Sequence, residues 1–294
     1  MRTPGPDQQD GNRNWAAARW RSPWLMARIL LVLLLAAAPL LAISAHVFGL
    51  APQNTTALLV IFPLIAVLAV LIAFSPHRID MVLGRGLLAG MVACLFYDAF
   101  RLFCVHVLAL MDDFIPVMGT WITGGSHGAA SAVVGYMWRY LGDGGGLGVA
   151  FFAIALAVGL GRRSTRPVRV VLAAVGFAVF VWAGLVATVV LAPRGEELMF
   201  RLTISTLAVT LIGHVIFGLV LALGFLQARR GWYGPELEWP LILSVPTRLR
   251  AHNVAQAHSR AHGRGRLSIR HFRRGRDSPL NSSDRSMSMI PRIR

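Results

Sequence analysis

Six long apolar segments, each close to the length needed to cross a lipid bilayer, constrain this chain more than any other feature of its sequence. A helix needs about 20 apolar residues to cross about 30 Å of hydrocarbon. Such segments occupy residues 29–50, 57–74, 86–110, 144–161, 170–191 and 202–226. Composition agrees, because 55% of the residues are hydrophobic and 14% are charged. We therefore predict an all-α, polytopic integral membrane protein, folded as a bundle of about six transmembrane helices.

The arginines between these segments predict which side of the membrane each connection faces. The chain contains no Lys, so all 29 of its basic residues are Arg, and basic residues near the ends of spans favour the cytoplasmic side. They concentrate in the N-terminus (1–28), in the connections 75–85 and 162–169, and after residue 226. The other connections are poorer in Arg and contain Asp112, Asp113, Asp143, Glu196 and Glu197. This pattern predicts a bacterial inner-membrane protein with both termini in the cytoplasm.

One further apolar stretch, residues 121–141, is interrupted by glycines and contains Arg139. If it were a seventh span, the Arg-rich connection 162–169 would lie outside the cell, against the charge pattern. We therefore expect an external or re-entrant helix at 121–141. The Gly-rich run 142–146 is expected to form a flexible break before the fourth span.

The segment after the last span is strongly basic. Residues 227–294 contain 14 Arg and four acidic residues, and we expect this cytoplasmic tail to be disordered. Because polybasic segments beside a membrane are attracted to anionic lipids, the expected partners are the bilayer and its anionic headgroups. Specific nucleic-acid binding is not expected, since the tail has neither interleaved aromatic residues nor a nucleic-acid motif. The sequence does not indicate an oligomeric state.

Asp98 and Arg101 are the only formal charges inside the six segments. Ionisable side chains at bilayer depth cost a few kcal/mol each, and therefore mark candidate functional sites. Asp98 is the middle residue of 86–110, and Arg101 lies three residues further along the same helix face. That face continues toward the N-terminus through small residues at four-residue intervals, Cys94, Gly90 and Gly86. We expect it to pack closely against another helix, with Asp98 facing into the bundle.

His214 is the middle residue of the sixth segment, so it is predicted at the same depth as Asp98. A carboxylate and an imidazole at that depth could relay a proton or bind a cation. Asp98, Arg101, His214 and the adjacent Tyr97 are therefore transport or proton-relay candidates, and a small transporter or permease is the favoured function. Alternatively, Asp98 and Arg101 neutralise each other and only fix helix packing, which favours a non-catalytic envelope scaffold or assembly partner.

The connection before the sixth segment contains the paired glutamates Glu196 and Glu197, followed by Arg201. Within residues 192–201 this pattern resembles the first motif of the CAAX-processing type of intramembrane metalloproteases. In that family paired glutamates and later histidines serve catalysis, so the resemblance implies a hydrolase site of Glu196, Glu197, Arg201 and His214. Two further motifs of the family are missing here. No other catalytic, cofactor or metal-ligand spacing occurs, so we expect no cofactor and no metal.

Overall fold

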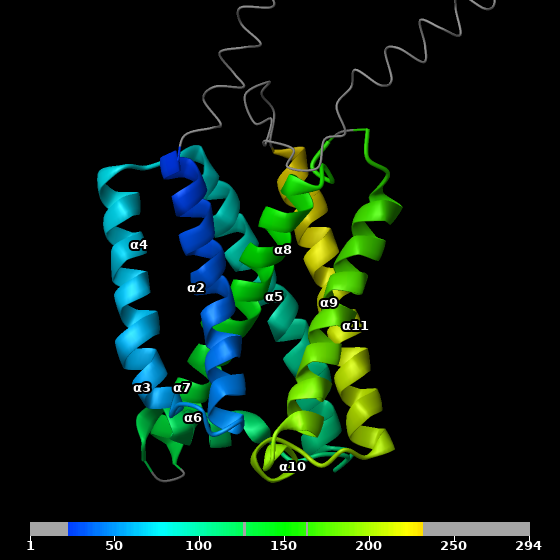
Figure 1. The fold of residues 1–294 in the computed structure, drawn as a ribbon. Coiled ribbons are helices and arrows are strands. Elements are labelled where there is room, and N and C mark those ends of the chain that lie inside the picture. The colour runs from blue at the N-terminus through cyan, green and yellow to red at the C-terminus, as the bar shows by residue number, and fades with distance from the viewer. Residues whose placement is uncertain (1–22, 126–127, 163, 232–294) are drawn as a thin grey trace, which may run out of the picture. The chain divides into compact units, whose positions relative to one another are not determined.

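The computed structural model describes residues 23–125, 128–162 and 164–231. Within these ranges the chain forms helices and no strands, and six helices are long and apolar enough to cross a membrane. The predicted all-α bundle of six spans is therefore confirmed (Figure 1). The basic segments 1–22 and 232–294 lie outside the described residues, so the disorder expected for the tail stays a prediction.

The six spans and two short helices account for most of the described chain. The spans are α2 (Pro23–Val47), α3–η1–α4 (Gln53–Thr56, Ala57–Ile61, Phe62–Phe74), α5 (Arg78–His106), α7–η2–α8 (Ala129–Met137, Trp138–Gly144, Gly145–Ala157), α9 (Pro167–Leu191) and α11 (Ile204–Arg230). The short helices are α6 (Phe114–Thr123) and α10 (Gly195–Leu198). Both short helices lie at the end of the bundle opposite the start of α2 and the end of α11 (Figure 1).

Helix α5 begins at residue 78, earlier than predicted, because Asp80 in its first turn caps the helix and is paired with an arginine. The Asp80 carboxylate accepts a hydrogen bond from the backbone N–H of His77 at 2.8 Å, which caps the helix. Asp80 also forms an ion pair with Arg28 of α2. The helix therefore starts at residue 78 and ends at residue 106 rather than running from 86 to 110.

These helix limits change the depth that was predicted for Asp98 and His214. The middle residue of α5 is Val92, and Asp98 lies six residues beyond it, about 9 Å along the axis at 1.5 Å per residue. His214 lies three residues before Phe217, the middle residue of α11. Both side chains are displaced toward the end of the bundle that contains α6 and α10, so the prediction that each sits at the middle of its helix is wrong.

The fourth span differs most from its prediction. Helices α7, η2 and α8 follow one another without interruption from Ala129 to Ala157, so the span does not begin at residue 144. The stretch 121–141 is not one external or re-entrant helix. It is divided between the end of α6 and the first half of the fourth span, because α6 ends at Thr123 and its C-cap residue Gly124 adopts the left-handed conformation (φ 65°).

The glycines predicted to form a flexible break are instead helical, and they and their neighbours make close contacts with other helices. A Cβ atom added to Gly144 would lie 2.5 Å from Cβ of Cys94, and one added to Gly148 would collide with the carbonyl oxygen of Gly86. A Cβ atom on Gly90 would in turn collide with the carbonyl oxygen of Gly144. Small residues allow two membrane helices to approach to backbone contact. The predicted close packing of the Asp98 face is therefore confirmed.

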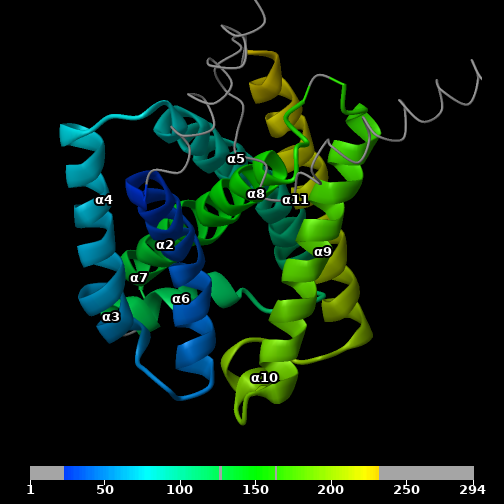
Figure 2. The same ribbon diagram turned by 45° about the horizontal axis from the view of Figure 1, so that its top comes forward.

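Around this contact the other spans occupy the periphery. Helix α11 packs against α5 and α9, and α2 packs against α8 and η2. The second span stands at the edge of the bundle beside α2, as both views show (Figures 1 and 2). All residues of α4 are at least partly exposed, and large apolar side chains such as Phe62, Phe74 and, on α9, Phe180 point outward. These apolar faces indicate contact with the lipid bilayer.

The contact between α5 and the fourth span predicts opposite effects for two glycine substitutions on the same helix. Gly90→Ala should destabilise the protein by about 1–3 kcal/mol, because the added methyl group overpacks the interface. Gly84→Ala should be neutral or slightly stabilising, because open space surrounds a Cβ at Gly84 and Ala favours helix. Thermal unfolding of both variants in detergent would test this. Equal melting temperatures for the two variants would contradict the packing described here.

Candidate functional site

Five charged side chains within the described ranges form a continuous series of ion pairs inside the bundle, which we call the charge chain. In order of contact its members are Asp113, Arg101, Asp98, Arg139 and Asp143. Arg101 approaches Asp113 through Nη1 at 2.7 Å and Asp98 through Nε at 3.1 Å. Arg139 approaches Asp98 through Nε at 3.5 Å and Asp143 through Nη1 at 3.9 Å.

Three helical segments contribute these residues. Asp98 and Arg101 lie one turn apart on α5, and Arg139 and Asp143 lie one turn apart on η2. Asp113 is the N-cap residue of α6, where its carboxylate accepts the backbone N–H of Ile115 at 3.3 Å. The exposed fractions of Asp98, Asp143 and Arg101 are 1%, 3% and 4%. The prediction that Asp98 faces into the bundle is therefore confirmed, and Arg101 is buried with it.

Tyr136 of α7 forms hydrogen bonds with two residues at one end of the charge chain. Its hydroxyl group accepts a hydrogen bond from Nη2 of Arg101 at 3.3 Å and donates one to Oδ2 of Asp113 at 3.2 Å. Arg101 thus makes directional contacts with two carboxylates and one phenol. At this end of the charge chain the positive charge of Arg101 is consequently balanced by nearby carboxylates.

Tyr97 connects the other end of the charge chain to α11. The Arg139 guanidinium carbon lies 4.6 Å from the centre of the Tyr97 ring, in a cation–π contact. The His214 ring meets Tyr97 edge-on at 5.2 Å between centroids, and Nδ1 of His214 lies 2.8 Å from the carbonyl oxygen of Thr210. The structure therefore places Tyr97 and His214 beside the charge chain, with the Tyr97 ring in contact with both His214 and Arg139.

The Arg139 end of the chain is loosely bonded. Among the described residues, Nε of Arg139, Oδ1 of Asp143 and Nε1 of Trp138 are buried without a hydrogen-bond partner. The 3.5 and 3.9 Å separations exceed the usual distance of an N–H···O hydrogen bond. These three residues all belong to η2, a π-helical segment, and such segments occur frequently at functional sites.

Sequence reasoning missed four members of this arrangement, namely Asp113, Tyr136, Arg139 and Asp143. All four lie in stretches that were assigned to outer connections or to an external helix. One signal was available, because Arg139 and Asp143 are four residues apart and can share one helix face. The predicted Gly-rich break separated them from the fourth span and hid that relation.

The residues of the hydrolase hypothesis are not brought together. Glu196 and Glu197 are exposed on α10, where Nε of Arg194 donates to Oε2 of Glu197 at 2.9 Å and this hydrogen bond lowers the pKa of the Glu197 carboxyl. Arg201 is also exposed, whereas His214 is buried inside the bundle. Within the described ranges, no three His, Cys, Asp or Glu side chains lie close enough together to hold a metal ion.

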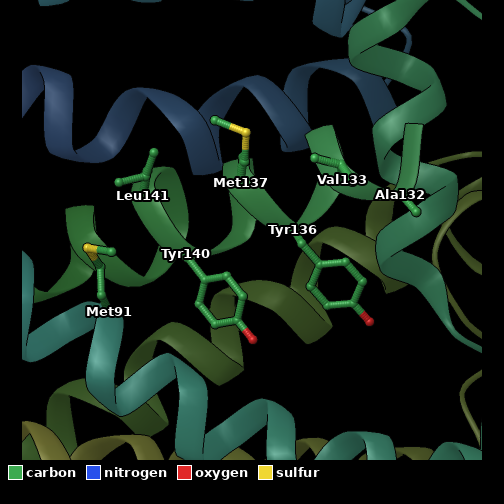
Figure 3. A pocket seen from close by; sticks show the side chains of 7 residues that line it. All are labelled: Met91, Ala132, Val133, Tyr136, Met137, Tyr140 and Leu141. Atoms are coloured by element: carbon green, nitrogen blue, oxygen red, sulfur yellow. The ribbon is translucent and has the colours of Figure 1, made fainter. Parts of the chain in front are cut away.

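An apolar groove of about 460 Å³ lies beside the charge chain (Figure 3). Its lining comes from α5 and from the first half of the fourth span, through Met91, Ala132, Val133, Tyr136, Met137, Tyr140 and Leu141. The rings of Tyr136 and Tyr140 stack with their centroids 6.2 Å apart. Tyr136 therefore belongs to both features, because its ring lines the groove while its hydroxyl group bonds to Arg101 and Asp113.

The chain matches no known family model, no curated protein and no solved structure. The class that the fold defines is a multi-pass membrane protein.

The pairing pattern predicts unequal costs for removing different members of the charge chain. Arg101→Gln should destabilise the protein by about 3–5 kcal/mol, because it removes the ion pair of Asp113 and the shorter of the two ion pairs of Asp98. Asp143→Asn should cost much less, because it leaves two carboxylates facing two guanidiniums. Unfolding in detergent would measure both, with Arg194→Gln at the exposed Arg194–Glu197 pair as a control that should change nothing measurable. Equal losses for Arg101→Gln and Asp143→Asn would contradict the pattern.

The tyrosine pair provides a second, matched comparison. Tyr136→Phe should destabilise the protein by about 1–3 kcal/mol, since it removes the hydroxyl bonded to Arg101 and Asp113. Tyr140→Phe should have little effect, because its hydroxyl makes no hydrogen bond to the described residues. The same unfolding assay applies to both variants. The role given to Tyr136 would be wrong if Tyr140→Phe were the more damaging change.

Proposed function

We propose that the protein is a small proton-linked transporter of a bacterial inner membrane, in which the charge chain is part of the proton path. The observation that supports this proposal is an imbalance of charge. The charge chain contains three carboxylates and two guanidiniums, so its formal charge is −1 when every member is ionised. An uncompensated buried charge costs several kcal/mol, and a proton taken up from water removes it.

The position of the charge chain suits proton entry from one side of the membrane. Asp113, whose side chain is 19% exposed, caps α6 at one end of the bundle, while Asp143 lies inside the fourth span. With both termini in the cytoplasm, as the arginine pattern predicts, the Asp113 end faces outward. A proton arriving there would meet Asp98 as the next carboxylate.

Tyr97 and His214 suggest how the path continues toward α11. A carbonyl oxygen only accepts hydrogen bonds, so Nδ1 of His214 donates to Thr210, and neutral His214 keeps Nε2 as an acceptor. His214 contacts the ring of Tyr97, which in turn faces Arg139. We assign Tyr97 and His214 to the inner part of the path, and we assign Arg101 to holding Asp98 and Asp113 in place.

The alternative of a purely structural scaffold has a different requirement. Buried ion pairs that only fix helix packing are most favourable when their charges balance, and apolar residues often replace them without loss. The extra carboxylate makes the charge chain more costly than a structural role needs. For this reason we favour transport over an envelope scaffold or assembly partner.

Proton movement into liposomes tests the proposal directly. Purified protein in liposomes, with a pH-sensitive dye inside, should acidify the lumen after an external acid pulse faster than protein-free liposomes do. Asp98→Asn should reduce the initial rate to that of protein-free liposomes, because it removes the central carboxylate of the chain. Asp112→Asn, at the exposed neighbour of Asp113, should behave like the wild type.

Two outcomes of this experiment would contradict the proposal. One is a wild-type rate equal to that of empty liposomes, and the other is an unchanged rate in Asp98→Asn that is properly folded. In either case the scaffold becomes the better hypothesis, and crosslinking in membranes should then recover a protein partner.

A further inference from the structure

We infer that Asp143 is the residue that binds the exchangeable proton, in a site formed by Asp143, Arg139 and Asp98. This inference deepens the proposed function, and the part that the site plays in transport rests on that proposal. The protonation of Asp143 is nevertheless a property of the protein that can be measured without any transport assay.

The three carboxylates of the charge chain differ in how many cations and hydrogen-bond donors stabilise their negative charge. Asp113 accepts hydrogen bonds from Arg101 at 2.7 Å, from the Tyr136 hydroxyl and from a backbone N–H. Asp98 faces two guanidiniums, those of Arg101 at 3.1 Å and Arg139 at 3.5 Å. Asp143 has one cation at 3.9 Å. Among the three, Asp143 therefore gains least from being ionised.

The burial of Asp143 strengthens this distinction. Its exposed fraction is 3%, and Oδ1 has no hydrogen-bond partner among the described residues. A buried carboxylate oxygen without a donor loses its hydration and gains nothing in return, so such groups tend to become neutral. Protonation forms an O–H bond on the carboxyl group and brings the formal charge of the chain from −1 to zero.

The groups that face Asp143 from neighbouring elements support the same assignment. From α5 come the like charge of Asp98, with Arg101 and Cys94 beside it, and from η2 comes Arg139. Helix α2 presents Pro39 to Gly142 and Ala36 to Gly146, which brings no charge. From α11, His214 reaches this region through Tyr97. Among the described residues, Arg139 is thus the one cation in direct contact with Asp143, and Asp98 shares it.

A metal cation is a poorer occupant of this site than a proton. Alkali and alkaline-earth cations need several oxygen ligands at short distance, whereas Asp143 shares its surroundings with a guanidinium at 3.9 Å. That guanidinium would repel a metal ion. A proton requires only the free Oδ1 atom.

The loose contacts of Arg139 show how proton binding would affect the rest of the chain. Its guanidinium stacks on Tyr97 at 4.6 Å, and its Nε has no hydrogen-bond partner in the described structure. When Asp143 is neutral, attraction to Asp98 dominates and draws Arg139 toward α5. When Asp143 loses its proton, the two carboxylates share Arg139 again.

Infrared difference spectroscopy of the full-length protein in lipid tests the inference. A step from neutral to alkaline pH should remove a C=O stretching band of a protonated carboxyl group in the wild type. Selective isotope labelling of aspartate should shift that band. Asp143→Asn should lack the band, and Asp112→Asn should keep it unchanged.

Asp143→Glu protects the experiment against a variant that does not fold. It keeps a carboxyl group at the site, but in aspartate-labelled protein its band should stay at the unlabelled frequency. The inference is overturned if wild-type protein shows no such band, or if the band in Asp143→Glu still shifts with labelled aspartate. In the second case another aspartate binds the proton.

The infrared and liposome results separate this inference from the proposed function. A band assigned to Asp143 together with liposomes that do not acidify would uphold the proton site and reject transport. Acidification by a protein whose band does not depend on Asp143 would uphold transport and reject the site.

Discussion

The backbone contact between α5 and the fourth span is the interaction on which the rest of this structure depends. Gly86 and Gly90 on one helix meet Gly144 and Gly148 on the other, and any side chain at these positions would separate the two helices. Because Asp98 follows Gly90 by two turns on α5, and Arg139 and Asp143 adjoin Gly144 on η2, the same contact brings the charged residues within ion-pair distance. The ion pairs of the charge chain therefore depend on the glycines beside them, which let α5 and the fourth span approach each other.

The charge chain has two ends with different physical properties. The Arg101 end is bonded to two carboxylates and to a tyrosine, and behaves as a fixed structural unit. The Arg139 end has long ion-pair distances and unpartnered polar atoms within the described structure. A rigid end next to a loosely bonded end with surplus negative charge is an arrangement that favours reversible proton binding. Tyr136 adds a link to the apolar groove, since its ring lines that groove.

Much of the fold follows from the sequence, because exposing polar backbone groups to the hydrocarbon core is costly and so requires each span to be a long apolar helix. Length and hydrophobicity therefore indicated that there are six spans and placed five of them approximately, and the small residues before Asp98 indicated a buried face. Arg139 and Asp143 could not be placed this way. A scan for uncharged runs excludes charged residues such as these, although Arg139 forms ion pairs with Asp143 four residues away and with Asp98 on another helix. The same scan left Asp80 in the connection 75–85, although its carboxylate caps α5 by accepting the backbone N–H of His77.

Glycine has two opposite meanings in a membrane sequence, which explains the error at residues 142–146. In water a run of glycines favours a flexible connection, but between packed membrane helices it permits close contact. Only the partner helix decides between the two. His214 illustrates a related limit, because the sequence indicated only its approximate depth. Helix α11 packs against the ring of Tyr97 at Gly213, where an added Cβ atom would lie only 2.6 Å from Cε2 of Tyr97. The imidazole therefore contacts Tyr97 rather than Asp98.

The central claim is that surplus negative charge in the charge chain is neutralised by a proton that can leave and return. Electrical recording from protein in a solid-supported membrane after rapid pH jumps measures this charge movement directly. We expect a transient current in the wild type after each pH jump, and loss of that current in Asp143→Asn. Identical currents from the wild type and a folded Asp143→Asn variant would contradict it.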